Sequence, residues 1–361
     1  TTVPLDPKVL DATALAALWQ MPSLAEELKS VDLPRLWWCA RAGELSITCL
    51  DAAPVIGATL RRFRGVVLAS ATLSPIDALA AACGTEPPAP PPLRTPVVAT
   101  PDRLGVLTKR ATKKLYRQLA TGGDLLRVEE DRAAESLHLV EAHTPWREGA
   151  YRVAYDARVD TSYQQRERFR TTTADTVLAL RAAAGNGVAV FFPSYAYAEA
   201  IMQETAAREG AWRIALQPRR VELAAQAQWV EDALSAADAL FLVLGSSFAE
   251  GIDSLGGRVS HALVVGPALP EVNACQRARL VDAADRGLSR DEAVRRVYRI
   301  PGLQKVNQAL GRLVRAPGQQ AKVLLHCRRF LEPAFASLLA RDYQGGDVIR
   351  TDPDLRAWLE R

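Results

Sequence analysis

Two short stretches of the chain carry residue types that suit phosphate chemistry. The first, 307–315, reads Asn-Gln-Ala-Leu-Gly-Arg-Leu-Val-Arg, and the second, 248–253, reads Phe-Ala-Glu-Gly-Ile-Asp. On a helix, Gln308, Arg312 and Arg315 would fall near one face because they are spaced at i, i+4 and i+7. Arginine is always ionised and offers rigid paired donors, so this face suits the charge that develops on a transferring phosphoryl group. Such chemistry needs a fold that brings a nucleotide to it.

Two further candidate sites follow apolar stretches that read as buried strands. The sequence Ser-Ala-Thr at 70–72 follows the apolar residues 65–69, and Ser194 with its neighbouring tyrosine follows residues 188–192. In doubly wound sheets, ligands bind beyond the carboxyl ends of the strands, so hydroxyl groups there are well placed for binding. The alternatives are a strand exit with a helix N-cap, and simple packing for the tyrosine.

The elements that must position these residues alternate between short apolar strands and helices. Beyond residue 146, strands are expected at 151–155, 188–192, 212–216, 240–244, 259–265 and 322–327, with helices at 161–184, 199–209 and 221–236. This alternation predicts an α/β fold with a mostly parallel sheet of about five or six strands flanked by helices. Helices within 7–30 and strands at 37–38, 44–50 and 65–69 precede a proline-rich connector at 86–96.

Composition places the chain among globular proteins. Its 361 residues, 48% of them hydrophobic, allow about two or three domains. No apolar run approaches the roughly 18 residues that a membrane span needs, and the start Thr-Thr-Val-Pro resembles no signal peptide. We therefore expect a cytoplasmic protein that spans no membrane. The five cysteines are scattered without ligand spacing, so we expect neither a disulfide framework nor a metal site from them.

The net charge of +4 is modest, but basic residues gather in two segments. The first comprises Lys109, Arg110, Lys113, Lys114 and Arg117, and the second comprises Arg286, Arg290, Arg295, Arg296 and Arg299. Segments of this kind suit phosphate backbones. The alternative is a pair of solvated helix faces.

The order of the candidate sites carries a family resemblance. The series SATLSP at 70–75, VAVFFPSYAYAE at 188–199, GSSFAEGID at 245–253 and RIPGLQKVNQALGRLVR at 299–315 resembles motifs III to VI of the XPD/DinG family of superfamily 2 DNA helicases. The similarity runs from about Trp37 to Phe330, apart from the stretch around 86–145. It implies a RecA-like fold for the alternating part. One departure is His326-Cys327, where relatives usually carry an acid.

The resemblance implies a role for each matching residue. It makes Arg312 and Arg315 arginine fingers on the γ-phosphate, with Gln308 positioning the nucleotide or the attacking water. It assigns ATP contacts to Glu250, Gly251, Asp253 and Gly311, coupling between motor domains to Ser70, Ala71 and Thr72, and single-strand contacts to Ser194 and Tyr195. The alternatives remain that the two arginines pair with acids at the surface, and that Glu250 only complements a helix dipole.

Two elements of a complete motor are missing from the sequence. No lysine stands between Gly and Ser or Thr as a phosphate loop requires, and no Asp-Glu-Ala-His-like box ends an apolar strand. In the family both precede the Ser-Ala-Thr motif, as do the iron–sulfur cysteines where present. The resemblance thus implies a chain that begins after them, with ATP and Mg²⁺ held mainly by an N-terminal motor half and no iron–sulfur cluster here.

We therefore expect the C-terminal part of an ATP-dependent DNA helicase, a monomer that acts on single-stranded DNA with the N-terminal half of the same protein. The expected domains are a helical segment at 1–36, part of motor domain 1 at 37–100, a helical basic insertion or linker at 101–145 and motor domain 2 at 146–361. By itself this chain should be inactive as an ATPase. The rival classes are a helicase-derived nucleic-acid-binding or regulatory module without catalysis, and a metabolic nucleotide-binding enzyme. The latter lacks a strand-associated G-x-G-x-x-G.

Overall fold

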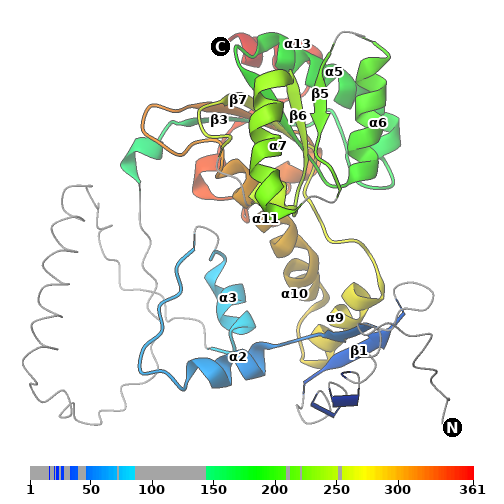
Figure 1. The fold of residues 1–361 in the computed structure, drawn as a ribbon, viewed down its shortest axis with the longest axis vertical. Coiled ribbons are helices and arrows are strands. Elements are labelled where there is room, and N and C mark those ends of the chain that lie inside the picture. Colours follow the sequence, from blue (N-terminus) through cyan, green and yellow to red (C-terminus); the bar gives the residue numbers. More distant parts are fainter. Residues whose placement is uncertain are drawn as a thin grey trace, which may run out of the picture.

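The described residues form two bodies. In the computed structural model they are 33–39, 46–70, 73–85, 144–208, 212–219, 222–250 and 254–361, with isolated helical positions between 16 and 27. We call the described residues of 144–265 and 300–361 the sheet body, and those of 33–85 and 274–299 the hairpin body. Figure 1 shows the sheet body above the hairpin body, with α11 (Ile300–Leu310) at the junction.

A seven-stranded sheet forms the centre of the sheet body. Its strands are β3 (Tyr151–Asp156), β4 (Gly187–Phe192), β5 (Ile214–Leu216), β6 (Ala239–Val243), β7 (Val259–Val264), β8 (Ala321–Leu325) and β9 (Asp347–Ile349). They lie in the order β5-β6-β4-β7-β8-β3-β9, and every neighbouring pair is parallel. Parallel pairing brings the carboxyl ends of all these strands to one edge of the sheet.

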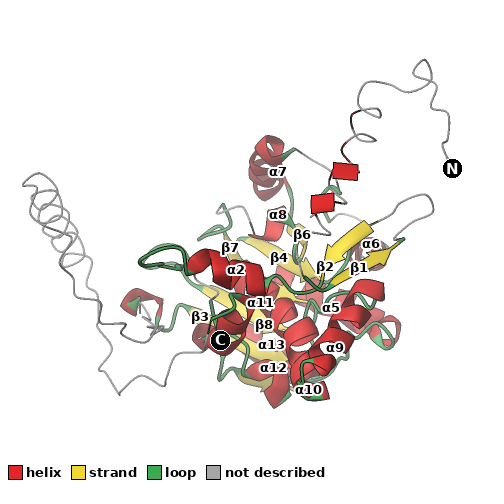
Figure 2. Cartoon of the chain, turned by 90° about the horizontal axis from the view of Figure 1, so that it is seen from below, coloured by secondary structure: helices red, strands yellow, loops and turns green. Residues whose placement is uncertain are grey.

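Helices cover both faces of this sheet (Figure 2). In β4, Ala189 and Phe191 join one apolar cluster while Val188, Val190 and Phe192 join the other, because successive side chains of a strand point to opposite faces. The first cluster packs against α7 (Leu223–Ala236), α8 (Ser247–Glu250), α11 and α12 (Pro333–Ala336), and the second against α5 (Arg170–Ala183), α6 (Tyr195–Ala206) and α13 (Asp352–Glu360). Short 3-10 turns are η1 (Pro145–Arg147), η2 (Arg166–Phe169), η4 (Arg328–Leu331) and η5 (Arg341–Tyr343).

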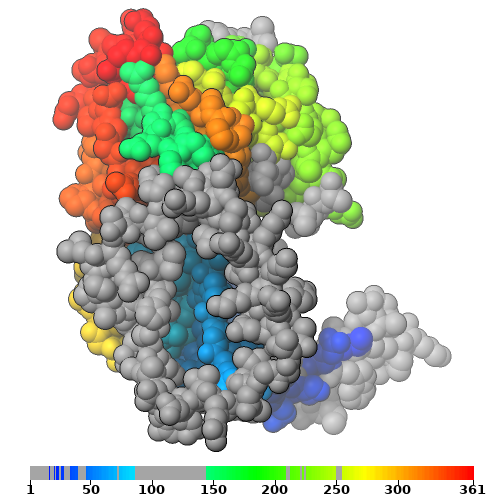
Figure 3. Space-filling view, turned by 90° about the vertical axis from the view of Figure 1, so that its left-hand side faces the viewer, coloured from blue at the N-terminus to red at the C-terminus, as the bar shows by residue number. Residues whose placement is uncertain are grey.

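The hairpin body joins two distant parts of the sequence. It contains the antiparallel strands β1 (Arg35–Trp38) and β2 (Ser46–Cys49), α2 (Ala53–Leu60), α3 (Ile76–Ala82), α9 (Ala274–Asp285), α10 (Arg290–Val294) and the π-helical turn η3 (Arg295–Arg299). Ion pairs link Asp51 to Arg286 and Asp77 to Arg295. In the space-filling view, the blue atoms of this body lie below the green-to-red atoms of the sheet body (Figure 3).

The α/β class and the parallel sheet were predicted correctly, whereas one strand prediction was wrong. Residues 65–69 are not a strand, and Val66, Val67 and Leu68 are exposed by 43%, 91% and 44%. An apolar run of this kind is a buried strand only where other strands flank it, and no pairing to it occurs among the described residues. In the sheet body, β9 raises the expected five or six strands to seven.

Two helix boundaries also differ from the prediction. The helix expected at 161–184 begins at Arg170, because the residues before it form turns and η2. The helix expected over 307–315 ends at Leu310. The predictions for the segment 101–143, including its basic residues, lie outside the described residues. Among the residues that the structure describes, no helix is long and apolar enough to cross a membrane.

Candidate nucleotide and nucleic-acid site

Helix α11 and the turn after it carry the candidate arginines. The helix is strongly amphipathic, with Leu303, Val306 and Leu310 buried against the sheet. Gly311 ends it, and a turn follows in which the Arg312 N–H donates to the Ala309 carbonyl oxygen at 3.2 Å. The predicted i, i+4, i+7 helical face is therefore wrong in its geometry, because only Gln308 lies on the helix.

The turn nevertheless holds both arginines in fixed places. Leu313 and Val314 are buried between them, while Arg312 is half-buried and Arg315 is exposed. The backbone N–H of Arg315 donates to Oε1 of Gln319 at 2.7 Å. Alternation of buried and accessible residues anchors the turn from below and presents the guanidinium groups at the surface.

The Tyr151 side chain also holds the C-terminal end of α11 by a hydrogen bond. The Tyr151 hydroxyl donates to the Leu310 carbonyl oxygen at 2.9 Å and accepts from Arg147 Nη2 at 3.2 Å. Burial raises the pKa of Tyr151, although the charge of Arg147 opposes this effect. Asn307 accepts from the Ala340 N–H at 3.0 Å and donates to the Leu338 carbonyl oxygen at 2.9 Å. These bonds satisfy groups at the helix C-terminus and fix its direction.

The loop after β6 lies against α11 and its turn. The Gly257 N–H donates to the Leu313 carbonyl oxygen at 3.3 Å, and a Cβ at Gly256 would lie 3.1 Å from Cβ of Arg315. Gly245 has φ +81°, and a Cβ there would lie 3.0 Å from Nζ of Lys305. The ammonium group of Lys305 therefore crosses the start of the loop.

The residues assigned to ATP contact in that loop are only partly visible. Glu250 is the last residue of α8, which packs against α11. Gly251 and Asp253 lie outside the described residues. Lys305 was missed by the sequence reasoning, although it stands three residues before Gln308 in the same motif. The structure thus packs the segment between β6 and β7 against α11, with Gly245 at Lys305 and Gly256 at Arg315.

Ser194 and Tyr195 stand at the carboxyl end of β4, and both have local partners. Ser194 is the N-cap of α6, and its Oγ accepts from the Tyr197 N–H at 3.4 Å. The Tyr195 hydroxyl accepts from Nε2 of Gln217 at 2.6 Å and donates to the Pro218 carbonyl oxygen at 3.2 Å. In the structure, Ser194 therefore caps α6.

The Ser-Ala-Thr motif lies in the hairpin body. Ser70 is exposed, and Ala71 and Thr72 lie outside the described residues. The helix that follows them, α3, bears Asp77, whose Oδ2 lies 2.9 Å from Arg295 Nη1 in η3. Because η3 continues directly into α11, a continuous path of structure joins this motif's helix to the candidate arginines.

The second basic segment is mostly neutralised. Arg286 pairs with Asp51 and Asp282, Arg295 with Asp77 and Glu292, Arg296 with Glu292, and Arg299 with Asp291. These pairs match the alternative of a solvated, ion-paired face rather than a surface for phosphate backbones. The second basic segment therefore no longer supports the alternative hypothesis of a helicase-derived nucleic-acid-binding module.

A buried polar chain follows the carboxyl ends of β3 and β8. Asp156 accepts from Arg158 Nη2 at 2.7 Å and lies 2.7 Å from His326 Nδ1, and His326 Nε2 lies 3.0 Å from Thr173 Oγ1. The Thr173 hydroxyl also donates to the Phe169 carbonyl oxygen at 2.9 Å. Burial opposes ionisation of Asp156, but His326 and Arg158 outweigh it and hold its pKa well below the usual value. An acid from β3 thus accompanies the histidine at this unusual position.

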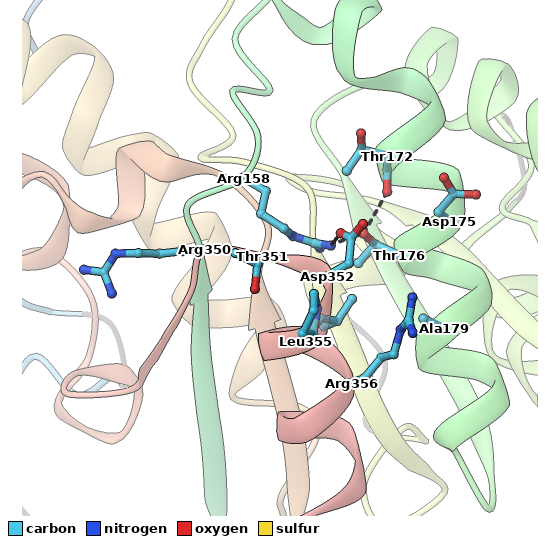
Figure 4. A pocket seen from close by; sticks show the side chains of 11 residues that line it. Arg158, Thr172, Asp175, Thr176, Ala179, Arg350, Thr351, Asp352, Leu355 and Arg356 are labelled. Carbon is cyan, nitrogen blue, oxygen red and sulfur yellow. Dashed lines mark hydrogen bonds and ion pairs between the residues drawn. The ribbon is translucent and has the colours of Figure 1, made fainter.

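A pocket of about 730 Å³ opens beside this chain, between α5 and α13 (Figure 4). Arg158, Thr176 and Asp352 line it, and Arg158 Nη1 donates to Asp352 Oδ1 at 2.5 Å. None of the sequence-predicted site residues lines this pocket. Among the described residues, no group of three or more His, Cys, Asp or Glu side chains is arranged to hold a metal ion.

Comparison with known proteins places the α11 site in a family domain. Residues 177–345 match the family model of the helicase C-terminal domain, which includes β4, β6, β7, α11 and β8. No curated protein matches the chain. The expectation of a helicase C-terminal region is therefore confirmed for this part of the chain.

Solved structures of XPD proteins are similar to the chain over part of their length. One titled XPD helicase shares 23% identity over 52% of this chain and 33% of its own, with a TM-score of 0.44. An apo XPD shares 20% over 55% and 40%, with a TM-score of 0.47. An XPD protein of S. tokodaii shares 16% over 58% and 40%, with a TM-score of 0.44. The chain thus spans between 33% and 40% of these proteins.

Proposed function

We propose that this chain, whose residues 177–345 match a helicase C-terminal domain, supplies one half of a composite ATPase site in a DNA helicase. The observation that carries the proposal is the packing of the segment between β6 and β7 against Lys305 at Gly245 and against the turn with Arg312 and Arg315 at Gly256 and Gly257. This donor set is cationic, which fits a polyphosphate. An N-terminal motor half would supply the phosphate cradle and Mg²⁺.

In this proposal the arginines act as fingers on the γ-phosphate. Phosphoryl transfer spreads negative charge over the equatorial oxygens, so catalysis rests on positioning and on cations held in place. The buried Leu313 and Val314 and the clamp from Tyr151 supply that rigidity. Gln308, on the last turn of α11, is placed to orient a nucleotide or water beside them.

The same helix would couple the two motor halves. Asp77 of α3 pairs with Arg295 of η3, and η3 leads directly into α11. A shift of the Ser-Ala-Thr segment on ATP binding would therefore be transmitted to the arginine turn. Single-stranded DNA would pass the carboxyl edge of the sheet, where Ser194 caps α6 and offers its hydroxyl near exposed backbone.

The test measures DNA-stimulated ATP hydrolysis by the full-length protein. Arg312→Ala and Arg315→Ala should each lower kcat by about 10³- to 10⁵-fold, the range that arginine fingers contribute. Arg213→Ala removes an exposed arginine at the far end of the sheet and should leave turnover unchanged. Unimpaired turnover in both finger variants would remove the assignment.

A second measurement concerns the chain by itself. Because its proposed fingers have no phosphate cradle opposite them, the purified chain should bind ATP weakly and hydrolyse none when DNA is added. Addition of the N-terminal motor half should restore turnover. Robust Mg²⁺-dependent hydrolysis by this chain alone would refute the composite site.

A further inference from the structure

An aromatic side chain stands exposed on the loop between β3 and α5. Tyr163 is 81% exposed, although tyrosine rings usually bury most of their surface. The loop that bears it is nevertheless ordered by hydrogen bonds. The Ser162 N–H donates to Asp160 Oδ1 at 3.0 Å, and the Gln165 and Arg166 N–H groups donate to the Ser162 carbonyl oxygen at 2.9 Å and 2.8 Å. The tyrosine is therefore displayed from a fixed backbone.

One guanidinium group fixes the ring from a single side. The Cζ atom of Arg166 lies 4.6 Å from the centroid of the Tyr163 ring and 5.1 Å from the centroid of the buried Tyr197 ring. The Tyr197 hydroxyl donates to the Arg166 carbonyl oxygen at 3.2 Å and lies 3.3 Å from Thr173 Oγ1, which belongs to the buried polar chain. With Arg166 against one face, the exposure of Tyr163 leaves its other face open to solvent.

This ring is continuous with the proposed path of single-stranded DNA. Tyr197, which contacts Arg166, also donates its backbone N–H to Oγ of Ser194. Tyr195, by contrast, has a half-buried ring that Arg219 covers at 5.1 Å and a hydroxyl with two partners. The better platform for a base at this edge is Tyr163 rather than the tyrosine predicted from sequence.

The charge around the ring favours an anionic polymer. Arg166, Arg168, Arg170 and Arg328 lie on the same loop, the first residue of α5 and the adjacent η4, and the acids paired with them are Glu167 and Asp160. Four cations against two acids leave a net positive edge. A cationic edge beside an open aromatic face is the arrangement that binds unpaired nucleotides without reading their sequence.

We propose that Tyr163, braced by Arg166, is a stacking platform for an unpaired base of single-stranded DNA at the carboxyl edge of the sheet. The proposal rests on the proposed helicase function. Arg166 supplies a rigid support from behind, and its charge also attracts the backbone of the bound strand. Because every base has a π-face, the platform would bind without sequence preference.

The test titrates the chain against a fluorescent oligothymidylate of about 12 nucleotides and follows anisotropy. Tyr163→Ala should weaken binding about 5- to 150-fold, the loss expected for one stacked base. Tyr163→Phe keeps the ring and should retain wild-type affinity. Phe63→Ala removes an exposed aromatic of the hairpin body and should change nothing. Since Tyr163 is exposed, the variants should fold normally, which circular dichroism checks.

An abasic strand of equal length separates stacking from charge. On this strand the ratio of wild-type to Tyr163→Ala affinity should fall to one, because no base remains to stack. An equal loss on both strands, or no loss on either, would overturn the platform while leaving DNA binding by the chain intact. Failure of the wild-type chain to bind either strand at any salt concentration would overturn both this platform and the DNA-binding part of the proposed function.

Discussion

Two apolar stretches of similar composition differ in burial and in strand pairing between the two bodies. In the sheet body, Val188–Phe192 is wholly buried and pairs with a parallel strand on each side. In the hairpin body, Val66–Leu68 is exposed and lies in no sheet among the described residues. An apolar run therefore forms a buried strand only where neighbouring strands are present to pair with its backbone.

This contrast fits the proposed function. A run that needs strands on both sides, next to the Ser-Ala-Thr motif, is what one edge of a motor domain would offer to its other half. In the sheet body, the strands pair with one another and the helices bury the apolar faces of the sheet. The two sequence segments of the hairpin body, in contrast, are held to each other by ion pairs and by the contact of α9 with β1.

The largest expected difference concerns the apolar cores. Phe191→Ala would open a cavity in the sheet body and should lower the free energy of unfolding by about 3–5 kcal/mol. Val67→Ala removes surface that is already in water and should change it by less than about 0.5 kcal/mol. Urea denaturation followed by circular dichroism measures both. Equal losses would mean that residue 67 is buried in solution and that the contrast between the bodies is false.

The buried ion pair of the sheet body should have a similar effect. Asp156→Asn removes the buried carboxylate that accepts from Arg158 and lies against His326, and leaves Arg158 with only the exposed Asp352 as a counter-charge, so it should destabilise the protein by about 3–5 kcal/mol. Because the pKa of Asp156 is lowered by folding, its contribution is present above the unfolded value of about 3.9 and is lost as pH falls below it. Acid titration of unfolding free energy should therefore be shallower in the variant. An unchanged acid slope would contradict the assignment.

A smaller, pH-dependent effect should arise from His261 in β7. Burial, with the nearby charge of Lys322, lowers its pKa to about 4. Unfolding returns this value to about 6.5, so the unfolded chain binds more protons between those limits and stability falls as pH decreases through this window. His261→Gln should flatten the stability profile between pH about 6.5 and 4. A slope unchanged by the substitution would assign it to other groups.

The fold was predictable where hydrophobic period and strand length agree. The strands β3, β4, β6, β7 and β8 stand within two residues of their predicted places, because each is a short stretch rich in apolar residues, and β3 is an alternating one. The three-residue strand β9 was missed, since Asp347–Ile349 is too short to give a period. The strand prediction for residues 65–69 was wrong because the sequence shows that these residues are apolar but not whether strands lie beside them to pair with.

The sequence predicted which stretches belong to the candidate site better than it predicted how their residues are arranged. Motif order identified the stretches 245–253 and 299–315 as candidates, and in the structure Gly256 lies against Arg315. That the helix would end at Leu310 depends on Tyr151, 159 residues away, which caps its last carbonyl. The exposed Tyr163 was not singled out, because exposure is set by tertiary packing. The folded structure is needed to show which tyrosine has a ring face exposed to solvent.

The smallest expected effect concerns an ion pair within the hairpin body. Arg295 of η3 pairs with Asp77 of α3 and with Glu292 of α10, and the groups are partly exposed. The hydrogen bond from Arg295 lowers the pKa of Asp77, but solvent screens such pairs. A double-mutant cycle with Asp77→Ala and Arg295→Ala should give a coupling of only about 0.2–1 kcal/mol, weaker in high salt. Asp291→Ala removes an acid from α10 that pairs only with Arg299 and serves as the control. A coupling well above this range would contradict the expectation that solvent screens this pair.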